Sequence, residues 1–286
     1  MTNLASNPPL EFMADLVREV GREVLQKSKA LEPGDIHYKA RTDIVTDVDI
    51  WCERTLSDRL LKAFPGSFVF GEETHAALGF TTDDQVHNYL AQEMVWLIDP
   101  IDGTSNFANG IPHFAISVGL LSGGQRVAGV VFDPSRNELF QAAKGSGAYL
   151  NGTPIAVSTK RELLDGIVAI SFASSSEQEW ADYLPLIQTL IRNSRSIRLL
   201  GCATLTECWV ACGRLEAAFE HRIKPWDVAA ASLIVEEAGG VILNPAHPLS
   251  GPDENIRCAS DFSLLGPDFL TTTPSLKDQV QKLLQR

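Results

Sequence analysis

The stretch WLIDPIDGTSNF, residues 96–107, places two aspartates, Asp99 and Asp102, on either side of a proline at the end of an apolar run. The apolar residues before Asp99 predict a buried strand, so Asp99 is expected at its carboxyl end. Pro100 biases Asp99 toward extended backbone, and Asp-Gly is typical of a turn. The two carboxylates are therefore expected on the rim of a strand, directed at one place.

Two carboxylates that lie close together repel unless one is protonated or a cation lies between them. Hard divalent cations such as Mg²⁺ take oxygen ligands of this kind. The residues that follow, Gly103, Thr104 and Ser105, offer small side chains and backbone N–H groups. A helix or turn starting there would be suited to phosphate. These features indicate metal-assisted phosphoester chemistry, and the alternative is that both aspartates only cap a helix or form a turn.

Further acids follow apolar segments elsewhere in the chain. Glu72 and Glu73 come directly after SFVFG, where acids are costly unless water or a cation receives them. Asp227 follows a Pro-Trp pair at a predicted helix start, and Asp49 ends the segment DIVTDVD. Each has an ordinary alternative: solvated loop acids, a helix N-cap and a solvated strand-to-helix turn. Lys39 would by default be a surface lysine.

Bulk properties exclude several classes of protein. The 286 residues allow one large domain or two fused lobes. No apolar run is long enough to span a membrane, and the first residues lack the features of a secretory signal. The five scattered cysteines, without a CxxC pair, predict reduced thiols in a cytoplasmic protein. A net charge of −12 without basic clusters disfavours nucleic acid, and it would repel a phosphate ester unless bound cations inverted the local charge.

Periodicity predicts a mixture of helices and strands. Short apolar runs separated by turn residues over 114–157 indicate an antiparallel meander. After about residue 160 strands and helices alternate. We therefore expect an α+β protein in which helices are layered on a larger antiparallel sheet and a smaller mixed sheet. The expected helices are 10–29, 50–64, 179–192, 203–212, 227–238 and 278–286.

Three segments carry a resemblance to a known family. GEE at 71–73, WLIDPIDGTSNF at 96–107 and PWDVAAASLIVEEAGG at 225–240 resemble the motifs of the inositol monophosphatase family. That family comprises Mg²⁺-dependent, lithium-sensitive phosphatases within the sugar phosphatase superfamily. The resemblance implies a layered α-β-α-β-α fold and a homodimer. It also implies a single domain over 1–286, with an N-terminal lobe to about residue 160 and a C-terminal lobe from about 161.

The resemblance also implies a metal centre with two or three Mg²⁺ ions. Its ligands would be the side chains of Glu72, Asp99, Asp102 and Asp227, together with the backbone carbonyl of Ile101.

The remaining matched residues would serve the reaction. Asp49 and Thr104, beside Glu72, would orient and deprotonate the attacking water, and hydrolysis would proceed without a covalent intermediate. Gly103, Thr104 and Ser105 would bind the phosphate. Glu73 and Lys39 would lie next to the metal ligands without contacting the substrate.

The alcohol half of the substrate would meet Gly201, Ala203 and Glu220. An acid at the Glu220 position favours an inositol or similar polyol monophosphate. Cys202 departs from the Thr or Ser common in that turn, which leaves alcohol recognition open. The basic and histidine residues of the following loop, His221, Arg222 and Lys224, are expected to be exposed.

Other functions stay open as alternatives. They are a related phosphatase for fructose 1,6-bisphosphate, adenosine 3',5'-bisphosphate or histidinol phosphate, and a non-catalytic regulatory protein on the same scaffold. The sequence holds no GxxxxGK[ST] and no GxSxG motif. His75, His87 and His113 have no spacing typical of a zinc site or a catalytic triad, so we expect surface or structural roles for them.

Overall fold

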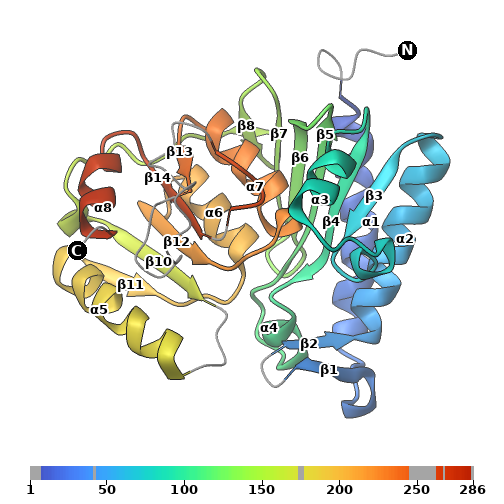
Figure 1. Ribbon diagram of the computed structural model, residues 1–286, viewed down its shortest axis with the longest axis horizontal. Coiled ribbons are helices and arrows are strands. Elements are labelled where there is room, and N and C mark those ends of the chain that lie inside the picture. Colours follow the sequence, from blue (N-terminus) through green and yellow to red (C-terminus); the bar gives the residue numbers. More distant parts are fainter. Residues whose placement is uncertain (1–7, 41–42, 173–176, 245–261, 267, 285–286) are drawn as a thin grey trace.

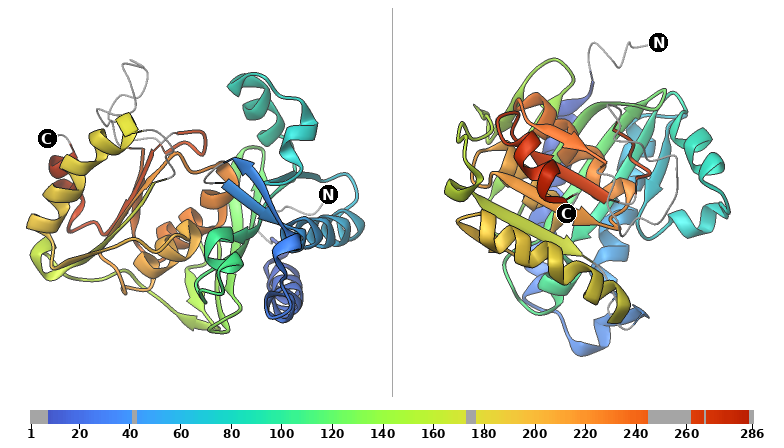
Figure 2. Two further views of the ribbon diagram at one scale, coloured as in Figure 1. Left: turned by 90° about the horizontal axis from the view of Figure 1, so that it is seen from below. Right: turned by 60° about the vertical axis from the view of Figure 1, so that its left-hand side comes forward.

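The protein is described by a computed structural model that covers residues 8–40, 43–172, 177–244, 262–266 and 268–284. Two β-sheets are each flanked by helices, and one pair of helices lies between them (Figures 1 and 2). The layers run in the order α1 and α2, seven-stranded sheet, α6 and α7, five-stranded sheet, α5 and α8. The layered α+β fold that was expected is therefore confirmed. The α-helices are α1 (Leu10–Ser28), α2 (Asp47–Ala63), α3 (Asp83–Leu90), α4 (Thr104–Ala108), α5 (Glu177–Asn193), α6 (Ala203–Ala211), α7 (Pro225–Glu237) and α8 (Lys277–Leu284), and the 3₁₀ helices are η1 (Pro33–Asp35), η2 (His75–Leu78) and η3 (Leu163–Asp165).

The larger sheet has strand order β3-β4-β5-β6-β7-β8-β9, and all its pairs except β3–β4 are antiparallel. It contains the meander predicted from the turn residues of 114–157. Its strands are β3 (Phe68–Gly71), β4 (Val95–Asp102), β5 (Ala115–Ser122), β6 (Gln125–Asp133), β7 (Glu138–Ala143), β8 (Ala148–Leu150) and β9 (Thr153–Pro154).

The smaller sheet has strand order β11-β10-β12-β14-β13 and is mixed, as expected for the C-terminal half. Its outer face packs on α5 and α8 through a cluster that includes Ile170, Leu190, Phe219 and Leu270. Its strands are β10 (Ile167–Phe172), β11 (Ser196–Arg198), β12 (Ala217–His221), β13 (Val241–Leu243) and β14 (Asp268–Thr272).

Successive side chains of β5 point to opposite faces of the larger sheet, and each face is covered by different helices. Ile116, Val118 and Leu120 lie in one cluster with the buried stripe of α1 and with α2. The residues between them face α7, because successive side chains of a strand point to opposite faces. Two glycines are paired on that face, Gly119 of β5 with Gly129 of β6. The small side chains of α7, Ala229 and Ala230, lie on this glycine pair. The missing side chains thus let α7 approach the sheet closely.

Several elements were not predicted from the sequence. Before α2, β1 (Ile36–Ala40) and β2 (Asp43–Thr46) form an antiparallel pair that was not predicted. The short helix α3 and the strand β14 were also missed, whereas α4 begins at Thr104, where a helix or turn was considered. Among the helices of the described residues, none combines the length and apolar character that a membrane crossing requires. The division into two lobes near residue 160 stays a prediction.

We expect the substitution Gly129→Ala to destabilise the protein by about 1–3 kcal/mol, because overpacking a tight helix–sheet contact forces the backbone apart. A Cβ atom at Gly129 would lie 2.6 Å from the carbonyl oxygen of Ala230. Urea unfolding measures the change. Gly34→Ala is the matched control, since a Cβ atom there meets nothing within 4 Å and its φ is not positive. Equal stability of the two variants would contradict close packing of α7 on the glycine pair.

Candidate active site

The pairing of β4 with β5 becomes irregular where the two aspartates lie. Asp99 is opposite Ser117 and Asp102 is opposite Ala115, so three residue steps on β4 face two on β5. This is a β-bulge, with one extra residue on β4. In a regular strand, residues three apart would point to opposite faces. The bulge allows both aspartates to be directed toward the layer that contains α6 and α7.

Asp99 is almost fully buried, with 1% of its surface exposed. Its Oδ1 atom has no hydrogen-bond partner in the described part of the chain. Burial raises the pKa of Asp99 well above its usual range, and the charges of Glu72, Asp102 and Asp227 raise it further. Asp227 in turn has a raised pKa, so these two acids lie close enough to affect each other. The acids from β4, from the loop after β3 and from the start of α7 therefore converge on one place.

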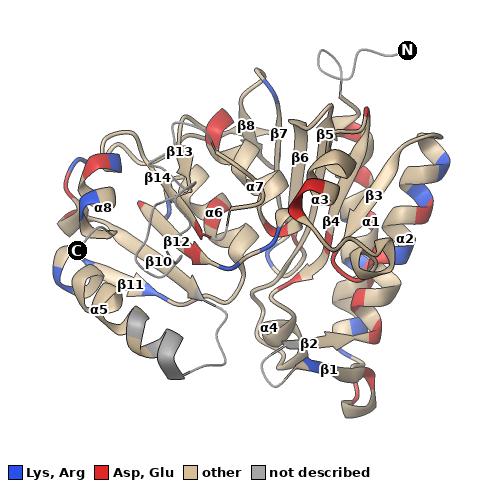
Figure 3. Ribbon diagram, viewed as in Figure 1, with Lys and Arg blue, Asp and Glu red and all other residues tan. Residues whose placement is uncertain are grey.

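This convergence contrasts with the distribution of charge over the rest of the molecule. Charged positions of both signs lie along the outer helices α1 and α2, whereas the strands carry few of them (Figure 3). Solvated charges on an outer helix cost little, but buried acids at a strand end need a proton or a cation.

The start of α6 holds Asp102 in position. The Oδ2 atom of Asp102 accepts hydrogen bonds from the backbone N–H of Thr204 at 2.6 Å, from its hydroxyl at 2.7 Å and from the thiol of Cys202 at 3.1 Å. Thr204 is fully buried. Sequence reasoning did not assign Thr204 a role, and it noted Cys202 only as a departure from the family pattern. The thiol supplies a donor of the kind a Ser or Thr hydroxyl would supply.

Asp227 is the third residue of α7, and Lys224 is the N-cap. The Asp227 carboxylate nevertheless caps the helix, because it accepts a hydrogen bond from the backbone of the N-cap residue. Its Oδ2 atom accepts a hydrogen bond from the backbone N–H of Lys224 at 2.7 Å. Burial raises the pKa of Asp227 to about 7, and the neighbouring charge of Asp102 contributes to this. The remaining oxygen of a carboxylate fixed in this way is available to a ligand.

Lys39 reaches from β1 to the acids that follow β3. Its ammonium group lies 2.7 Å from a carboxylate oxygen of Glu73 and 3.3 Å from one of Glu72. Burial opposes the charge of Lys39, but the two acids outweigh it and raise its pKa. Burial raises the pKa of Glu72 to about 8 although Lys39 acts against this shift. Lys39 is thus exposed, as a surface lysine would be, and it is also paired with two acids of the site.

Glu53 is a residue of the site that sequence reasoning missed. It is 1% exposed, and its Oε2 atom accepts a hydrogen bond from the backbone N–H of Glu73 at 2.7 Å. Burial raises its pKa. A signal was present in the sequence: Glu53 follows Asp49 by four residues and so lies on the same face of α2. Glu53 thus joins α2 to the loop that carries Glu72.

Asp49 and Thr104 form a hydrogen-bonded pair. The Oδ2 atom of Asp49 accepts from the backbone N–H of Thr46 at 2.9 Å and from the Thr46 hydroxyl. Its Oδ1 atom accepts from the Thr104 hydroxyl at 3.2 Å. The same hydroxyl lies 3.0 Å from the carbonyl oxygen of Ile101, and its single proton can serve only one of these acceptors at a time. Burial raises the pKa of Asp49 to about 6.

Gly103 joins β4 to α4 with a positive φ of 87°, which favours glycine. A Cβ atom there would lie 2.9 Å from the carbonyl oxygen of Gly201. This close approach brings the predicted phosphate segment, Gly103 to Ser105, against the predicted alcohol segment, Gly201 to Ala203. Ser105 is exposed at the first turn of α4.

Asn106, also missed from the sequence, ties these two segments together. Its Nδ2 atom donates to the carbonyl oxygens of His113 and Leu200, both at 2.8 Å, and to that of Gly201 at 3.2 Å. His113 is buried, which agrees with a structural role.

The residues predicted for the alcohol half of a substrate lie on the central strand of the five-stranded sheet, β12, and at the start of α6. Ala203 is the first residue of α6, and Glu220 lies near the end of β12. Glu220 is fully buried, and burial raises its pKa well above the usual range. The expectation that His221 is exposed was wrong: it is buried and hydrogen-bonded to Asp268. Arg222 and Lys224 are exposed, as expected.

The donor set suits a hard divalent cation. As the side chains lie, no three Asp, Glu, His or Cys side chains of the described residues surround a common point at coordination distance. Asp102 and Asp227 are each held by donors of the chain. All the converging side chains offer oxygen, which is the ligand that Mg²⁺ prefers. Burial and mutual repulsion favour protonation of these carboxyl groups. A bound cation would neutralise them in place of the protons.

We expect the protein in divalent-free buffer to lose stability as pH rises from 6 to 8.5. The acids with raised pKa bind protons in the folded state that the unfolded state has already released, and this stabilisation is lost as pH rises through their folded pKa values of about 6, 7 and 8. Asp99→Asn removes one acid of the group and should stabilise the protein at pH 8.5 by about 1–3 kcal/mol. Thermal unfolding measures both effects.

Asp58→Asn is the matched control for this experiment, because the Asp58 side chain is 73% exposed and lies on the outside of α2. It should leave the pH dependence unchanged. Stability that is constant or rises between pH 6 and 8.5, or an equal slope for Asp99→Asn and Asp58→Asn, would contradict the raised pKa values of these acids.

Known proteins resemble this chain over most of its length. The model of the inositol monophosphatase family matches residues 7–277. Inositol monophosphatase 1 of Solanum lycopersicum is 36% identical over 288 residues, which cover 99% of this chain and 98% of that protein. Nus factor SuhB of Xylella fastidiosa is 35% identical over 82% of this chain and 81% of its own length. The solved structure of a Thermotoga maritima IMPase has a TM-score of 0.79 and 30% identity, and the match covers 96% of this chain and 95% of that one.

The family match spans nearly the whole chain and includes the three segments that first suggested it. This chain belongs to the inositol monophosphatase family, whose members are metal-dependent phosphoric monoester hydrolases.

Proposed function

We propose that this enzyme is a Mg²⁺-dependent phosphatase that hydrolyses inositol monophosphate or a similar sugar or polyol monophosphate. One observation carries the proposal. Asp99 lies buried, with an unpartnered oxygen, where it experiences the charges of Glu72, Asp102 and Asp227. Such a group is stable when a divalent cation neutralises it, and a negatively charged protein needs that cation to attract a phosphate ester.

The residues that would hold two or three Mg²⁺ ions are Glu72, Asp99, Asp102 and Asp227, with the carbonyl group of Ile101. When bound, the ions would supply a lowered pKa for water and positive charge for the phosphoryl and leaving oxygens. Glu53 and Lys39 contact this set from its edge, through Glu73 and Glu72. We propose that they position the loop after β3 and do not contact the substrate.

Asp49 and Thr104 would act on the attacking water. When the Thr104 hydroxyl donates its proton to Asp49, its oxygen is free to accept a hydrogen bond from water. Asp49 can then receive the proton, and its pKa of about 6 in the absence of metal lies near the operating range of a general base. The backbone N–H groups of Gly103, Thr104 and Ser105 would orient the phosphate.

Recognition of the alcohol would involve Gly201, Ala203 and Glu220. Because Glu220 is fully buried, we propose that substrate hydroxyl groups reach it only after the side chains above it move. The proposal of a polyol rests on this acid, and phosphatase activity on other monophosphates or bisphosphates is the alternative for the same site.

A regulatory function is the second candidate. It is favoured by the similarity of this chain to Nus factor SuhB of Xylella fastidiosa, whose name describes a role other than hydrolysis. We also propose a homodimer and a cytoplasmic location. The described cysteines, Cys52, Cys202, Cys208 and Cys212, are unpaired thiols, which supports a reducing compartment.

Phosphate release from a panel tests the substrate class. The panel contains inositol 1-phosphate, fructose 1,6-bisphosphate, adenosine 3',5'-bisphosphate and histidinol phosphate, each with Mg²⁺, with a chelator, and with Mg²⁺ plus Li⁺. We expect turnover of inositol 1-phosphate well above the others, no turnover with chelator, and inhibition by Li⁺. Preference for a different member would reassign the substrate, and absence of turnover by folded protein would favour the regulatory candidate.

The role of Thr104 is tested by two substitutions. Thr104→Val removes the hydroxyl that links water to Asp49, and we expect kcat to fall about 10²-fold or more. Thr104→Ser keeps the hydroxyl and should stay within about tenfold of the wild type. Initial rates at saturating Mg²⁺ measure the difference, with thermal unfolding as the check on folding. Equal rates for the Val and Ser variants would exclude the proposed role of the hydroxyl.

A further inference from the structure

The two oxygens of Asp102 are used differently by the chain. The Oδ2 atom accepts hydrogen bonds from the backbone N–H of Thr204 at 2.6 Å, from the Thr204 hydroxyl at 2.7 Å and from the Cys202 thiol at 3.1 Å. All three donors are directed at this one atom, and the Oδ1 atom is not their acceptor. The carboxylate is therefore held to the start of α6 by one of its oxygens.

Three donors use the full capacity of the Oδ2 atom. An ionised carboxylate offers about four lone-pair sites, roughly two on each oxygen. Three hydrogen bonds to Oδ2 leave no lone pair on that atom for a further ligand. The lone pairs that remain belong to Oδ1, so a cation at Asp102 would be bound through a single oxygen.

The donors belong to a well-packed part of the fold. Cys202 is the N-cap of α6 and Thr204 is its second residue, and both side chains are buried. Cys202 makes no side-chain capping hydrogen bond to its own helix, so Asp102 caps α6 from a position 102 residues before Thr204. Hydrogen bonds to a charged acceptor are strong, and a rotation of the carboxylate would leave buried donors unpaired. The orientation of Asp102 is therefore fixed before any cation binds.

Two other acids of the cluster are less constrained. The Oδ1 atom of Asp99 has no hydrogen-bond partner in the described part of the chain. The Oδ2 atom of Asp227 accepts a hydrogen bond from the backbone N–H of Lys224 at 2.7 Å, which leaves a lone pair on that oxygen. Asp102 thus differs from both in having one oxygen that is fully occupied by the chain.

Ligation through one oxygen discriminates between divalent cations. Mg²⁺ is small and requires near-ideal octahedral geometry. Ca²⁺ is larger, takes about six to eight oxygen ligands, and is frequently bound by both oxygens of one carboxylate. A carboxylate that offers a single oxygen therefore satisfies Mg²⁺ but deprives Ca²⁺ of one ligand.

We propose that Thr204 and Cys202 are positioning residues that favour Mg²⁺ over Ca²⁺ at Asp102, because their donors occupy Oδ2 and leave only Oδ1 for the cation. They act through the carboxylate and are not themselves ligands. This inference rests on the proposed Mg²⁺ site and adds to it a reason for the choice of metal.

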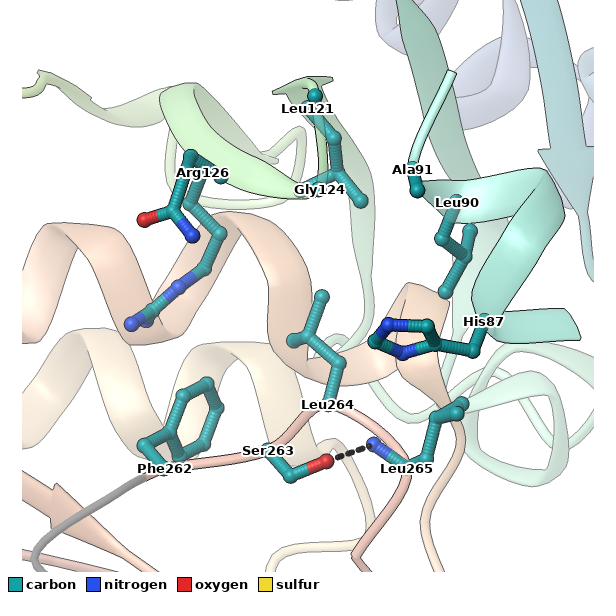
Figure 4. A pocket seen from close by; sticks show the side chains of 12 residues that line it. His87, Leu90, Ala91, Leu121, Gly124, Arg126, Phe262, Ser263, Leu264 and Leu265 are labelled. Carbon is teal, nitrogen blue, oxygen red and sulfur yellow. Dashed lines mark hydrogen bonds between the residues drawn. The ribbon is translucent and has the colours of Figure 1, made fainter. Parts of the chain in front are cut away.

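A cavity elsewhere in the molecule offers no carboxylate to a cation. It lies between α3, the β5–β6 turn and residues 262–265, and Arg126 and His87 are among the residues that line it (Figure 4). None of the described residues that line it is Asp or Glu. Cation binding in solution therefore reports the acid cluster and exposed acids, and Asp102→Asn identifies the binding step that belongs to Asp102.

Calorimetric titration of the metal-free protein with MgCl₂ and with CaCl₂ tests the proposal. The test variant combines Cys202→Ala with Thr204→Val, which removes the thiol and the hydroxyl and returns a lone pair to Oδ2. We expect the Mg²⁺ affinity of the Asp102 step to fall about 10- to 100-fold, as is usual when a group that orients a metal ligand is lost. The ratio of the Ca²⁺ Kd to the Mg²⁺ Kd should fall at least about tenfold, because Ca²⁺ gains a second oxygen.

The matched control combines Cys202→Ser with Thr204→Ser, because it changes the same two positions and keeps a donor at each. It should retain the wild-type ratio of the two Kd values. Thermal unfolding in divalent-free buffer checks that each variant folds. Thr204→Val alone is nearly isosteric, and it should lower the ratio by a smaller amount, since the thiol that remains is a weak donor.

Two results would overturn the inference, and they have different meanings. If the wild type binds no Mg²⁺ in a step that Asp102→Asn removes, the proposed Mg²⁺ site fails together with the inference. If the wild type binds Mg²⁺ in that step but the folded test and control variants have the same ratio of Kd values, the inference alone fails.

Discussion

Mutual repulsion of buried carboxylates at the end of β4 is the constraint on which the site depends. In a regular strand Asp99 and Asp102 would point to opposite faces of the sheet. The bulge adds one residue to β4 and so lets both side chains point to the same face. Helix α7 then adds Asp227, and the loop after β3 adds Glu72. An arrangement of this kind is unfavourable without protons or cations, so the fold around it must be rigid enough to impose it.

Two structural devices supply that rigidity. The glycine pair of β5 and β6 lets α7 pack closely on the larger sheet. This packing fixes the position of the first turn of α7 relative to β4. The start of α6 fixes Asp102 through three donors to one oxygen. The acid cluster is therefore built where the middle helix layer meets the end of the large sheet, and both sheets contribute to its walls.

Much of the fold and the main acids of the site could be predicted from the sequence, because the signals for them are local. The apolar run before Asp99 and the turn residues of the meander are periodic patterns that require no knowledge of distant contacts. Glu53, Thr204 and Asn106 were missed because their roles depend on partners far away in the chain, at Glu73, Asp102 and Leu200. His221 was misjudged for the same reason, since only the pairing of β12 with β14 brings it to Asp268.

The amide group of Asn106 determines which backbone groups the loop at residues 200–202 presents on each side. In a trans peptide the carbonyl and N–H groups point in opposite directions. Because the carbonyl groups of Leu200 and Gly201 turn toward Asn106, the N–H groups of Gly201 and Cys202 are directed away from it. The loop therefore has an acceptor side, which the chain satisfies itself, and a donor side. A molecule rich in hydrogen-bond acceptors, such as a phosphate ester, is complementary to the donor side.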